Sequence, residues 1–145
     1  MVKILIKRFD KKIKIPAYET SGSSGMDLMA FIKKRIIVKP YKTKLIPTGI
    51  ALSIPKNYEI QIRPRSGLAA KKGISVLNTP GTIDSDYRGE LKIILINLGK
   101  KSFVINPGDR IAQMVLCPVL KAKFKDVKNL ANTVRGKGGF GSTGK

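Results

Sequence analysis

The sequence contains no histidine, one cysteine and few acidic side chains among its 145 residues. Without histidine, His-based catalytic triads and His metal ligands are excluded, so carboxylates remain for any acid–base chemistry. The single cysteine, Cys117, excludes an intrachain disulfide, and its place in the apolar run "IAQMVLCPVL" predicts a buried strand thiol. Long apolar runs are also missing, because charges interrupt the N-terminal "MVKILIKRF". We therefore expect a cytoplasmic protein without a signal peptide or membrane span.

Positive charge dominates the composition: 29 Lys and Arg residues stand against nine Asp and Glu residues, a formal net charge of +20. Such an excess predicts attraction to nucleic acid, anionic lipid or a small phosphate-rich ligand. The lysines are scattered along the chain, which is typical of a solvated surface. A basic β-barrel that binds single-stranded nucleic acid is the alternative from another functional class. Such modules use clustered aromatic platforms, and this sequence has none, so we expect no stable nucleic-acid binding.

Short runs rich in β-branched residues alternate with Pro-, Gly- and Asn-containing turns, the pattern of an all-β sandwich or barrel. In "YEIQIR" (58–63) every second residue is apolar, so this strand should be half-buried. One short helix is expected over 66–73, with Ser66 as its N-cap and Gly73 as its left-handed C-terminal stop. Residues 78–97 should form a hairpin-like unit with a polar mouth. The expected strands are 2–7, 27–32, 35–39, 43–47, 49–54, 58–63, 74–77, 90–97, 102–105 and 110–119.

Three of the scarce carboxylates, Asp84, Asp86 and Glu90, fall close together in "NTPGTIDSDYRGELKI". One interpretation is an Asp-rich turn in which Asp86 or Glu90 pairs with Arg88. The other is a carboxylate that acts as a base or orients water near a triphosphate and a metal. Both interpretations stay open at this point.

Two further segments predict an anion site. In "RPRSGLAA", Arg65 and Ser66 precede the free N–H groups of Gly67 and Leu68 at the start of the expected helix, which is an arrangement that binds anions. In "NPGDRIAQ", a tight turn delivers Asp109, Arg110 and then Gln113 at the start of a strand. Together with the carboxylates, these segments predict a site for a phosphorylated, flat ligand.

Five motifs now match a known family in order: "SGMDLMA" (24–30), "PRSGLA" (64–69), "NTPGTIDSDYRGE" (78–90), "GDRIAQM" (108–114) and "RGKGGFGSTG" (135–144). On these motifs the chain resembles the trimeric deoxyuridine triphosphate diphosphatases (dUTPases), which cleave dUTP to dUMP and pyrophosphate. The resemblance implies a distorted jelly-roll or β-barrel with one short helix and a C-terminal arm, assembled as a homotrimer with shared active sites. It divides the chain into a β domain (1–124) and an arm with a Gly-rich lid motif (125–145).

The resemblance also implies the role of each site residue. Asp84 would hold the water that attacks the α-phosphorus, and Tyr87 would pack beneath the deoxyribose and exclude a 2′-hydroxyl. Asp27 would anchor the waters of a Mg²⁺ ion that is held mainly by the substrate phosphates. Uracil would be recognised by Asn78, Gly81, Thr82 and Ile83, and the phosphates would be held by Arg65, Ser66, Gly67 and Gln113. The other implied substrate contacts are Lys92, Arg135, Phe140, Gly141, Ser142 and Thr143.

Two departures from the family pattern are visible. "GSSG" (22–25) stands where alanines are more usual, and the arm segment "KDVKNLANTV" (125–134) lacks acidic character. The first is a change between small residues; the second leaves the packing of the arm open. The nearest alternative is a dCTP deaminase, which shares the fold, but "DSDYRGE" and the complete Gly-rich tail favour the diphosphatase. A non-enzymatic regulatory role on the same fold also stays open.

Overall fold

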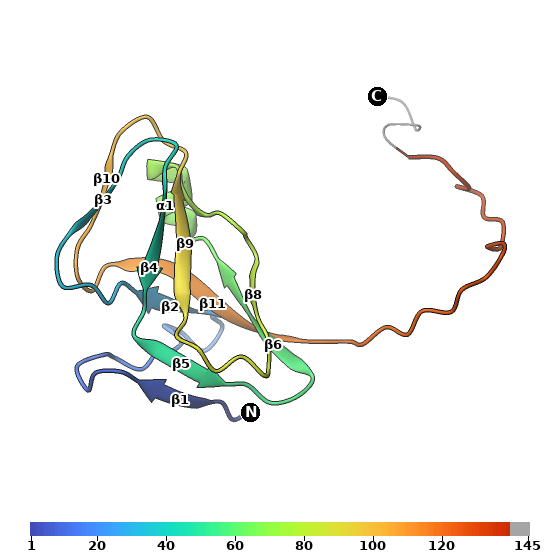
Figure 1. Ribbon diagram of the computed structural model, residues 1–145, viewed down its shortest axis with the longest axis horizontal. Helices are drawn as coiled ribbons and strands as arrows, with labels where there is room; N and C mark the ends of the chain where they lie inside the picture. The colour runs from blue at the N-terminus through green and yellow to red at the C-terminus, as the bar shows by residue number, and fades with distance from the viewer. Residues whose placement is uncertain (140–145) are drawn as a thin grey trace.

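The structure is a computed structural model, and it describes residues 1–139. The implied contacts Phe140, Gly141, Ser142 and Thr143 lie outside the described residues. The strands are β1 (Leu5–Arg8), β2 (Gly25–Met29), β3 (Ile36–Val38), β4 (Thr43–Pro47), β5 (Ile50–Ser53), β6 (Tyr58–Arg63), β7 (Ile74–Val76), β8 (Gly81–Ile83), β9 (Lys92–Asn97), β10 (Phe103–Ile105) and β11 (Arg110–Pro118). Within the described range the one helix is α1 (Ser66–Lys72). The predicted all-β class with one short helix is thereby confirmed (Figure 1).

The strands form four small sheets in which the paired neighbours are antiparallel. The largest has the order β2-β11-β6-β8, and the next has the order β4-β9-β7. Two-stranded sheets pair β1 with β5 and β3 with β10. The pairings of residues 1–139 do not close into a barrel. Long-range pairing therefore dominates the fold, and strands far apart in sequence, such as β2 and β11, become neighbours (Figure 1).

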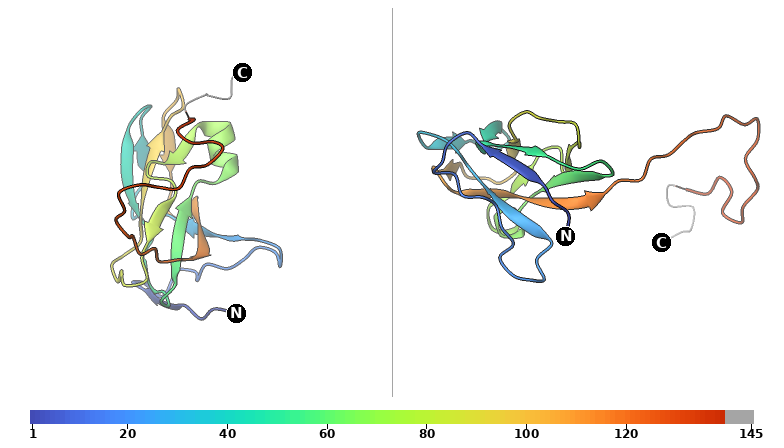
Figure 2. Two further views of the ribbon diagram at one scale, coloured as in Figure 1. Left: turned by 90° about the vertical axis from the view of Figure 1, so that its right-hand side faces the viewer. Right: turned by 90° about the horizontal axis from the view of Figure 1, so that it is seen from below.

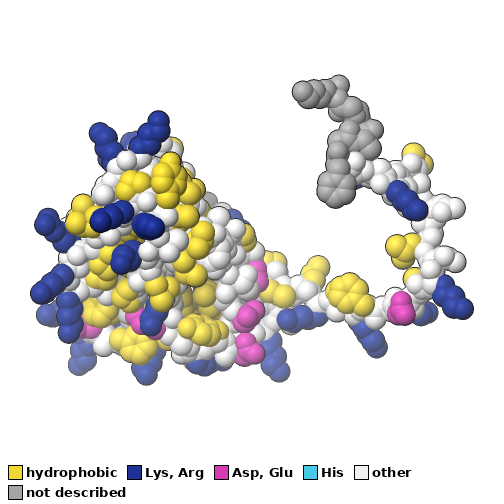
Figure 3. Space-filling model, turned by 45° about the horizontal axis from the view of Figure 1, so that its top comes forward, with side chains coloured by type: hydrophobic (Ala, Val, Ile, Leu, Met, Phe, Trp, Pro, Cys, Tyr) yellow, Lys and Arg dark blue, Asp and Glu magenta, His cyan; other side chains and the backbone are white. Residues whose placement is uncertain are grey.

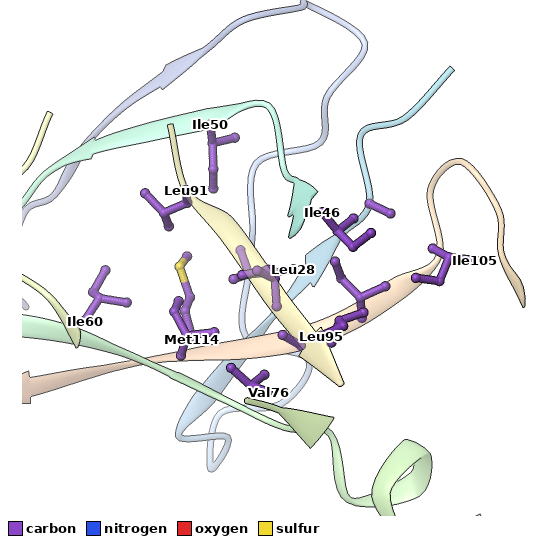
Figure 4. Close-up of a cluster of buried hydrophobic side chains, with 14 of the residues drawn as sticks. Leu28, Ile46, Ile50, Ile60, Val76, Leu91, Leu95, Ile105 and Met114 are labelled. Atoms are coloured by element: carbon purple, nitrogen blue, oxygen red, sulfur yellow. The ribbon is translucent and has the colours of Figure 1, made fainter. Parts of the chain in front are cut away.

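The core lies between the two larger sheets, where aliphatic side chains point toward one another (Figure 4). Leu28, Ile60 and Met114 come from the four-stranded sheet, while Ile46 and Leu95 come from the sheet that faces it. All five are buried. Burial of such side chains is the main favourable term in folding, and each contributes on the order of 1.5–3 kcal/mol.

Strand β6 shows how the sequence period directs side chains. Ile60 and Ile62 are buried, whereas Arg63 on the other face is exposed. The predicted half-buried strand is thus confirmed. In β11 the apolar run is longer, yet Cys117 near its end is only half-buried, so the prediction of a buried thiol was wrong.

The hairpin-like unit expected over 78–97 was also wrong. Strand β8 pairs with β6, whereas β9 pairs with β4 and β7, so the two strands of the expected unit belong to different sheets. Strand β8 has three residues and was not among the predicted strands. Whether three residues form a strand depends more on the neighbouring strand that pairs with them than on their own sequence.

The N-cap of helix α1 lies one residue earlier than expected. The N-cap is Arg65, whose side chain makes no capping hydrogen bond, and Ser66 is the first helical residue. The prediction of Ser66 as N-cap was therefore wrong. Gly73 does end the helix in the left-handed conformation, with φ of 67°. A Cβ there would lie 2.7 Å from the backbone N of Gly99, so a side chain is excluded by both space and backbone conformation.

Beyond Pro118 the described chain has neither helix nor strand and runs away from the body (Figures 1 and 2). Its large apolar side chains are exposed, with Leu120 at 97% and Phe124 at 93%. Lysines and arginines are spread over the visible surface of the body, as the sequence predicted, rather than gathered in one patch (Figure 3). No helix within residues 1–139 has the length and apolar character needed to cross a membrane.

Candidate active site

A hollow of about 420 Å³ lies where α1 begins. We call it the α1 hollow. Its walls come from β2, from the turn between β6 and α1, from α1 itself and from β11, and they are formed by Asp27, Arg65, Ser66, Gly67, Leu68, Lys71 and Gln113. Five of these residues were predicted as site residues; Leu68 was predicted only through its backbone N–H, and Lys71 was not predicted. The hollow thus joins three of the five sequence motifs in one place.

An ion pair fixes the guanidinium at the hollow. Arg65 donates through Nε to Oδ1 of Asp27 at 2.8 Å and through Nη2 to Oδ2 at 3.2 Å. This two-point geometry holds the plane of the guanidinium as well as its position. Asp27 is 18% exposed and Arg65 is 28% exposed, so the pair is only partly shielded from solvent. Positioning of the arginine is therefore the main effect expected of the pair, and its contribution to stability is modest.

Arg110 is a second partner of Asp27; the sequence placed it in a segment of the predicted anion site but gave it no individual role there. Its Nη1 lies 3.3 Å from Oδ2 of Asp27 and 3.8 Å from Oε1 of Glu19. Strand pairing explains the contact, because Arg110 starts β11 and is in register with Met29 at the end of β2. The motif spacing contained no signal for this pairing, since the two residues are far apart in the sequence.

Gln113 lies on β11, an inner strand of the four-stranded sheet, and its side chain lines the hollow. In register it lies between Asp27 on β2 and Arg63 on β6. Its side-chain amide donates to the carbonyl of Pro64 at 2.9 Å. A Cβ on Gly25 would lie 2.3 Å from Oε1 of Gln113, so this glycine leaves the space in which the glutamine side chain rests.

The first turn of α1 faces the hollow with few obstructions. The helical hydrogen bonds begin at the N–H of Leu68, which donates to the carbonyl of Arg65, so the prediction that this N–H is free was wrong. The preceding N–H groups, those of Ser66 and Gly67, belong to the set that a helix cannot satisfy internally. A Cβ on Gly67 would meet no described atom within 4 Å. Backbone donors and two cationic side chains, Arg65 and Lys71, thus line a hollow suited to an anion.

Three of the nine acidic residues, Asp84, Asp86 and Glu90, lie on one loop, which we call the 84–90 loop. Asp84 is exposed directly after β8, and its carbonyl accepts from the N–H of Tyr87 at 3.2 Å. The proposed ion pair of Asp86 or Glu90 with Arg88 was wrong. Arg88 instead donates to the carbonyls of Ser85 and Tyr87. The guanidinium therefore closes the turn, and the carboxylate of Asp84 has no partner among the described ion pairs and hydrogen bonds.

The residues assigned to a flat base lie just before that loop. Gly81 is buried in β8, while Asn78 and Thr82 are exposed and Ile83 is half-buried. A Cβ on Gly81 would approach Nδ2 of Asn78 to 3.1 Å, so the amide lies directly over the strand backbone. An amide beside exposed backbone groups is an arrangement that can pair with the edge of a base.

The α1 hollow and the 84–90 loop are not brought together within one chain. Strand β6 pairs Ile60 with Ile83, so Asp84 follows at the level of Glu59. Arg65 lies beyond the other end of β6. The four residue steps from Glu59 to Arg63 span roughly 13 Å of strand at about 3.3 Å per residue, so Asp84 and Arg65 are separated by most of the length of β6. Figure 1 shows the same separation, with α1 at one end of β6 and the chain after β8 leading toward the other.

Two other predicted contacts also lie apart from the hollow. Lys92 starts β9, with Nζ 3.7 Å from Oε2 of Glu90. Arg135 lies on the extended arm, where its Nε donates to the carbonyl of Gly138 at 3.0 Å. The sequence motifs therefore form three separate groups in one chain: the hollow, the 84–90 loop with its flanking strands, and the arm.

Comparison with known proteins identifies the family. The family model described as dUTPase matches residues 11–144. The chain belongs to the dUTPase family. A protein of Hydrogenobaculum sp. (strain Y04AAS1), named deoxyuridine 5′-triphosphate nucleotidohydrolase, is 54% identical over 143 residues, or 99% of each chain. One of the same name from Orientia tsutsugamushi (strain Boryong) is 57% identical over 139 residues, or 96% of this chain and 94% of the relative.

Solved structures agree with the family and the fold. The dUTPase of Staphylococcus bacteriophage 80alpha with dUPNHPP is 26% identical with a TM-score of 0.87, and the match covers 99% of both chains. A variant of the dUTPase from phage phi11 of S. aureus, described with a structural Mg(II) ion, has a TM-score of 0.79 and covers 90% of this chain and 99% of its own. At 22% identity, that second likeness shows the fold alone. The predicted dUTPase family, jelly-roll fold and enzyme class are thus confirmed.

Proposed function

We propose that the protein hydrolyses dUTP to dUMP and pyrophosphate in a Mg²⁺-dependent reaction at sites shared between three subunits. Water attacks the α-phosphorus in line, so a new P–O bond forms as the bond to the β-phosphate oxygen breaks and pyrophosphate leaves. The reaction would keep uracil out of DNA and supply dUMP for thymidylate synthesis. The observation that carries the proposal is the α1 hollow, in which Arg65, Gln113 and free backbone donors converge in a member of the dUTPase family.

The α1 hollow is the phosphate subsite of this proposal. A triphosphate carries several negative charges, and Arg65 and Lys71 supply two positive charges on the walls. Arg65 is already oriented by Asp27, so little side-chain entropy is lost when phosphate binds. Ser66 and Gly67 add a hydroxyl and backbone N–H groups, and Gln113 adds an amide.

The residues at the hollow also fit a water-mediated Mg²⁺ site. Residues 1–139 contain no group of three His, Cys, Asp or Glu side chains that could hold a metal directly. Mg²⁺ usually keeps several waters and binds through few carboxylates plus substrate phosphates. Asp27 already accepts three hydrogen bonds from Arg65 and Arg110. A carboxylate has about four lone-pair sites, so Asp27 retains one for such a water. The ion would neutralise charge on the phosphates.

Asp84 and Tyr87 are assigned to the reacting end and the sugar. With no histidine in the chain, a carboxylate has to hold the attacking water and accept its proton. Asp84 is exposed and makes no described ion pair that would compete for that role. Tyr87, 44% exposed on the same loop, would lie beneath the deoxyribose and leave no room for a 2′-hydroxyl. Asn78, Gly81, Thr82 and Ile83 would pair with uracil, and Lys92 would add a further contact.

The separation of Asp84 from Arg65 supports a site formed between subunits. One chain holds the two groups at different ends of β6, whereas one substrate has to contact both. The arm supports the same arrangement, because Leu120 and Phe124 are almost fully exposed in the single chain and need a surface to cover them. We therefore assign the hollow to one subunit and the 84–90 loop to a second. The tail belongs to a third: Arg135 would reach the γ-phosphate, Phe140 would stack on uracil, and Gly141, Ser142 and Thr143 would cap the phosphates.

The test is pyrophosphate release from dUTP, dTTP, dCTP and UTP, with and without Mg²⁺. We expect turnover of dUTP to exceed that of the other nucleotides and to depend on Mg²⁺. Equal turnover of UTP would contradict the role of Tyr87, and full activity in a chelator would contradict the metal. Release of ammonia from dCTP would instead identify a deaminase. Tight oligonucleotide binding that dUTP does not displace would favour the nucleic-acid-binding alternative.

A further inference from the structure

Gly89, in the 84–90 loop, has no side chain, and the reason lies in its neighbour. A Cβ on Gly89 would lie 2.3 Å from the hydroxyl oxygen of Tyr87 and 2.5 Å from its Cζ. Separations under 3.0 Å are essentially never adopted by real Cβ atoms. The backbone of Gly89 is outside the left-handed region, so its conformation does not require glycine. What excludes a side chain is the ring of Tyr87.

One hydrogen bond fixes the backbone of Tyr87 and another fixes the end of its ring. The backbone N–H of Tyr87 donates to the carbonyl of Asp84 at 3.2 Å, and its hydroxyl donates to the carbonyl of Glu90 at 3.1 Å. The ring therefore lies against the backbone at Gly89, with its hydroxyl at the carbonyl of Glu90. Without room at this glycine, the hydroxyl could not reach the carbonyl of Glu90.

The far end of the loop is fixed to the body. Oε1 of Glu90 accepts from the N–H of Gly49 at 2.9 Å. The next residue, Leu91, is buried and bonds through its backbone to Thr48 and Ile50. Glu90 thus gives the hydroxyl of Tyr87 a stationary acceptor, although the ring itself is 44% exposed.

We propose that Gly89 is a specificity-determining positioning residue: its missing side chain lets the ring of Tyr87 lie on the 84–90 loop, where it excludes a 2′-hydroxyl from the sugar site. The inference rests on the proposed role of Tyr87 and extends it to the residue that sets the ring position. Gly89 itself has no side chain to touch the substrate. A methyl group there would push the ring outward and break its hydrogen bond to Glu90.

The experiment measures kcat/KM for dUTP and for UTP in Gly89→Ala, Tyr87→Ala, the double variant and Gly22→Ala. Gly22 is the matched control, because a Cβ there meets no described atom within 4 Å. We expect Gly89→Ala to lower the dUTP/UTP ratio of kcat/KM at least about tenfold, the order expected when one methyl group disturbs a fitted pocket. The control should leave the ratio unchanged.

The double variant separates positioning from a general loss of structure. If Gly89 acts through Tyr87, the double variant should have the same dUTP/UTP ratio of kcat/KM as Tyr87→Ala alone, because both substitutions then remove the same steric barrier. Two independent effects would multiply, and that result would overturn the inference. Retention of the wild-type ratio by Gly89→Ala would also overturn it. Thermal unfolding of each variant checks that the fold is kept.

The same measurements distinguish failure of the inference from failure of the proposed function. If Tyr87→Ala loses discrimination and Gly89→Ala keeps it, Tyr87 retains its role and only the positioning by Gly89 is wrong. If Tyr87→Ala itself keeps discrimination, the role of Tyr87 is wrong and the inference falls with it. In case Gly89→Ala prevents folding, Tyr87→Phe provides the second variant. It keeps the ring but removes the bond to Glu90, and an unchanged dUTP/UTP ratio would then count against the inference.

Discussion

In the α1 hollow, side chains from segments far apart in sequence hold one another, whereas in the 84–90 loop a short local segment holds itself. Asp27 orients Arg65 from across the sheet. In the loop, Tyr87 and Arg88 bond to backbone carbonyls within a few residues. The hollow is therefore pre-organised for charge by tertiary contacts. The loop instead leaves the carboxylate of Asp84 exposed and without a described partner, which is what its proposed role in holding the attacking water requires.

The largest effect is expected at the loop. Asp84→Asn removes the proton acceptor without changing the size of the side chain, and the chain has no histidine to replace it. We expect kcat to fall at least ~100-fold. Nucleotide affinity should be nearly retained, because the proposed phosphate contacts lie at the other end of β6. Single-turnover kinetics and equilibrium binding of dUTP measure the two quantities separately, and near-normal turnover would remove Asp84 from its role.

In the α1 hollow, by contrast, a substitution should weaken nucleotide binding more than it lowers turnover. Arg65→Ala removes a charge-assisted contact to phosphate and leaves Asp27 with Arg110 as its remaining described partner. We expect KM for dUTP to rise roughly 10–100-fold, the order of a lost hydrogen bond to a charged group. Arg65→Lys should recover only part of this, because an ammonium group cannot form the two-point bond to Asp27. A larger fall in kcat than in binding would contradict the assignment of Arg65 to the phosphates.

A mixture of the two impaired chains, assayed at dUTP well below the wild-type KM, tests whether the two regions belong to different subunits. If each site takes Asp84 from one chain and Arg65 from another, co-assembled Asp84→Asn and Arg65→Ala chains regain kcat/KM. Random assortment joins the two intact groups in about one site in four, so recovery can reach roughly a quarter of the wild-type kcat/KM. Sites contained within single chains would regain nothing on mixing. Each variant assembled alone is the control.

A smaller effect is expected from Gly25→Ala, which disturbs the hollow without removing any of its functional groups. The new Cβ would occupy the space of Oε1 of Gln113, and that side chain can swing away at modest cost. The bond from Gln113 to the carbonyl of Pro64 would be lost. We expect KM to rise about 3–10-fold with little change in stability, the order of one neutral hydrogen bond. An unchanged KM would show that the phosphates do not use the amide of Gln113.

The smallest effect concerns the charge outside both regions. The net charge of +20 should attract a triphosphate at a distance, so kcat/KM for dUTP should fall a few-fold as ionic strength rises, with kcat unchanged. Steady-state kinetics from low to high salt measure this dependence. A flat profile would mean that the lysines scattered over the body serve another purpose (Figure 3).

Local features were the easiest to predict. The alternation in β6 and the glycine that ends α1 depend on neighbouring residues, and both were correct. The N-cap of α1 and the hairpin-like unit over 78–97 were wrong, because the local sequence does not set the exact start of a helix or the partner of a three-residue strand. The pairing of Asp27 with Arg110 could not be predicted at all, since it requires the register of β2 and β11.

The sequence by itself determined the all-β class, the order of the five motifs and the residue types available for chemistry, because period, turn chemistry and composition are local properties of the chain. Only the tertiary structure decided that Asp27, Arg65 and Gln113 share one hollow, and that Asp84 follows β8 toward the opposite end of β6. The physical reason is that antiparallel pairing places residues by register across strands, and register depends on which strands bury their apolar faces together.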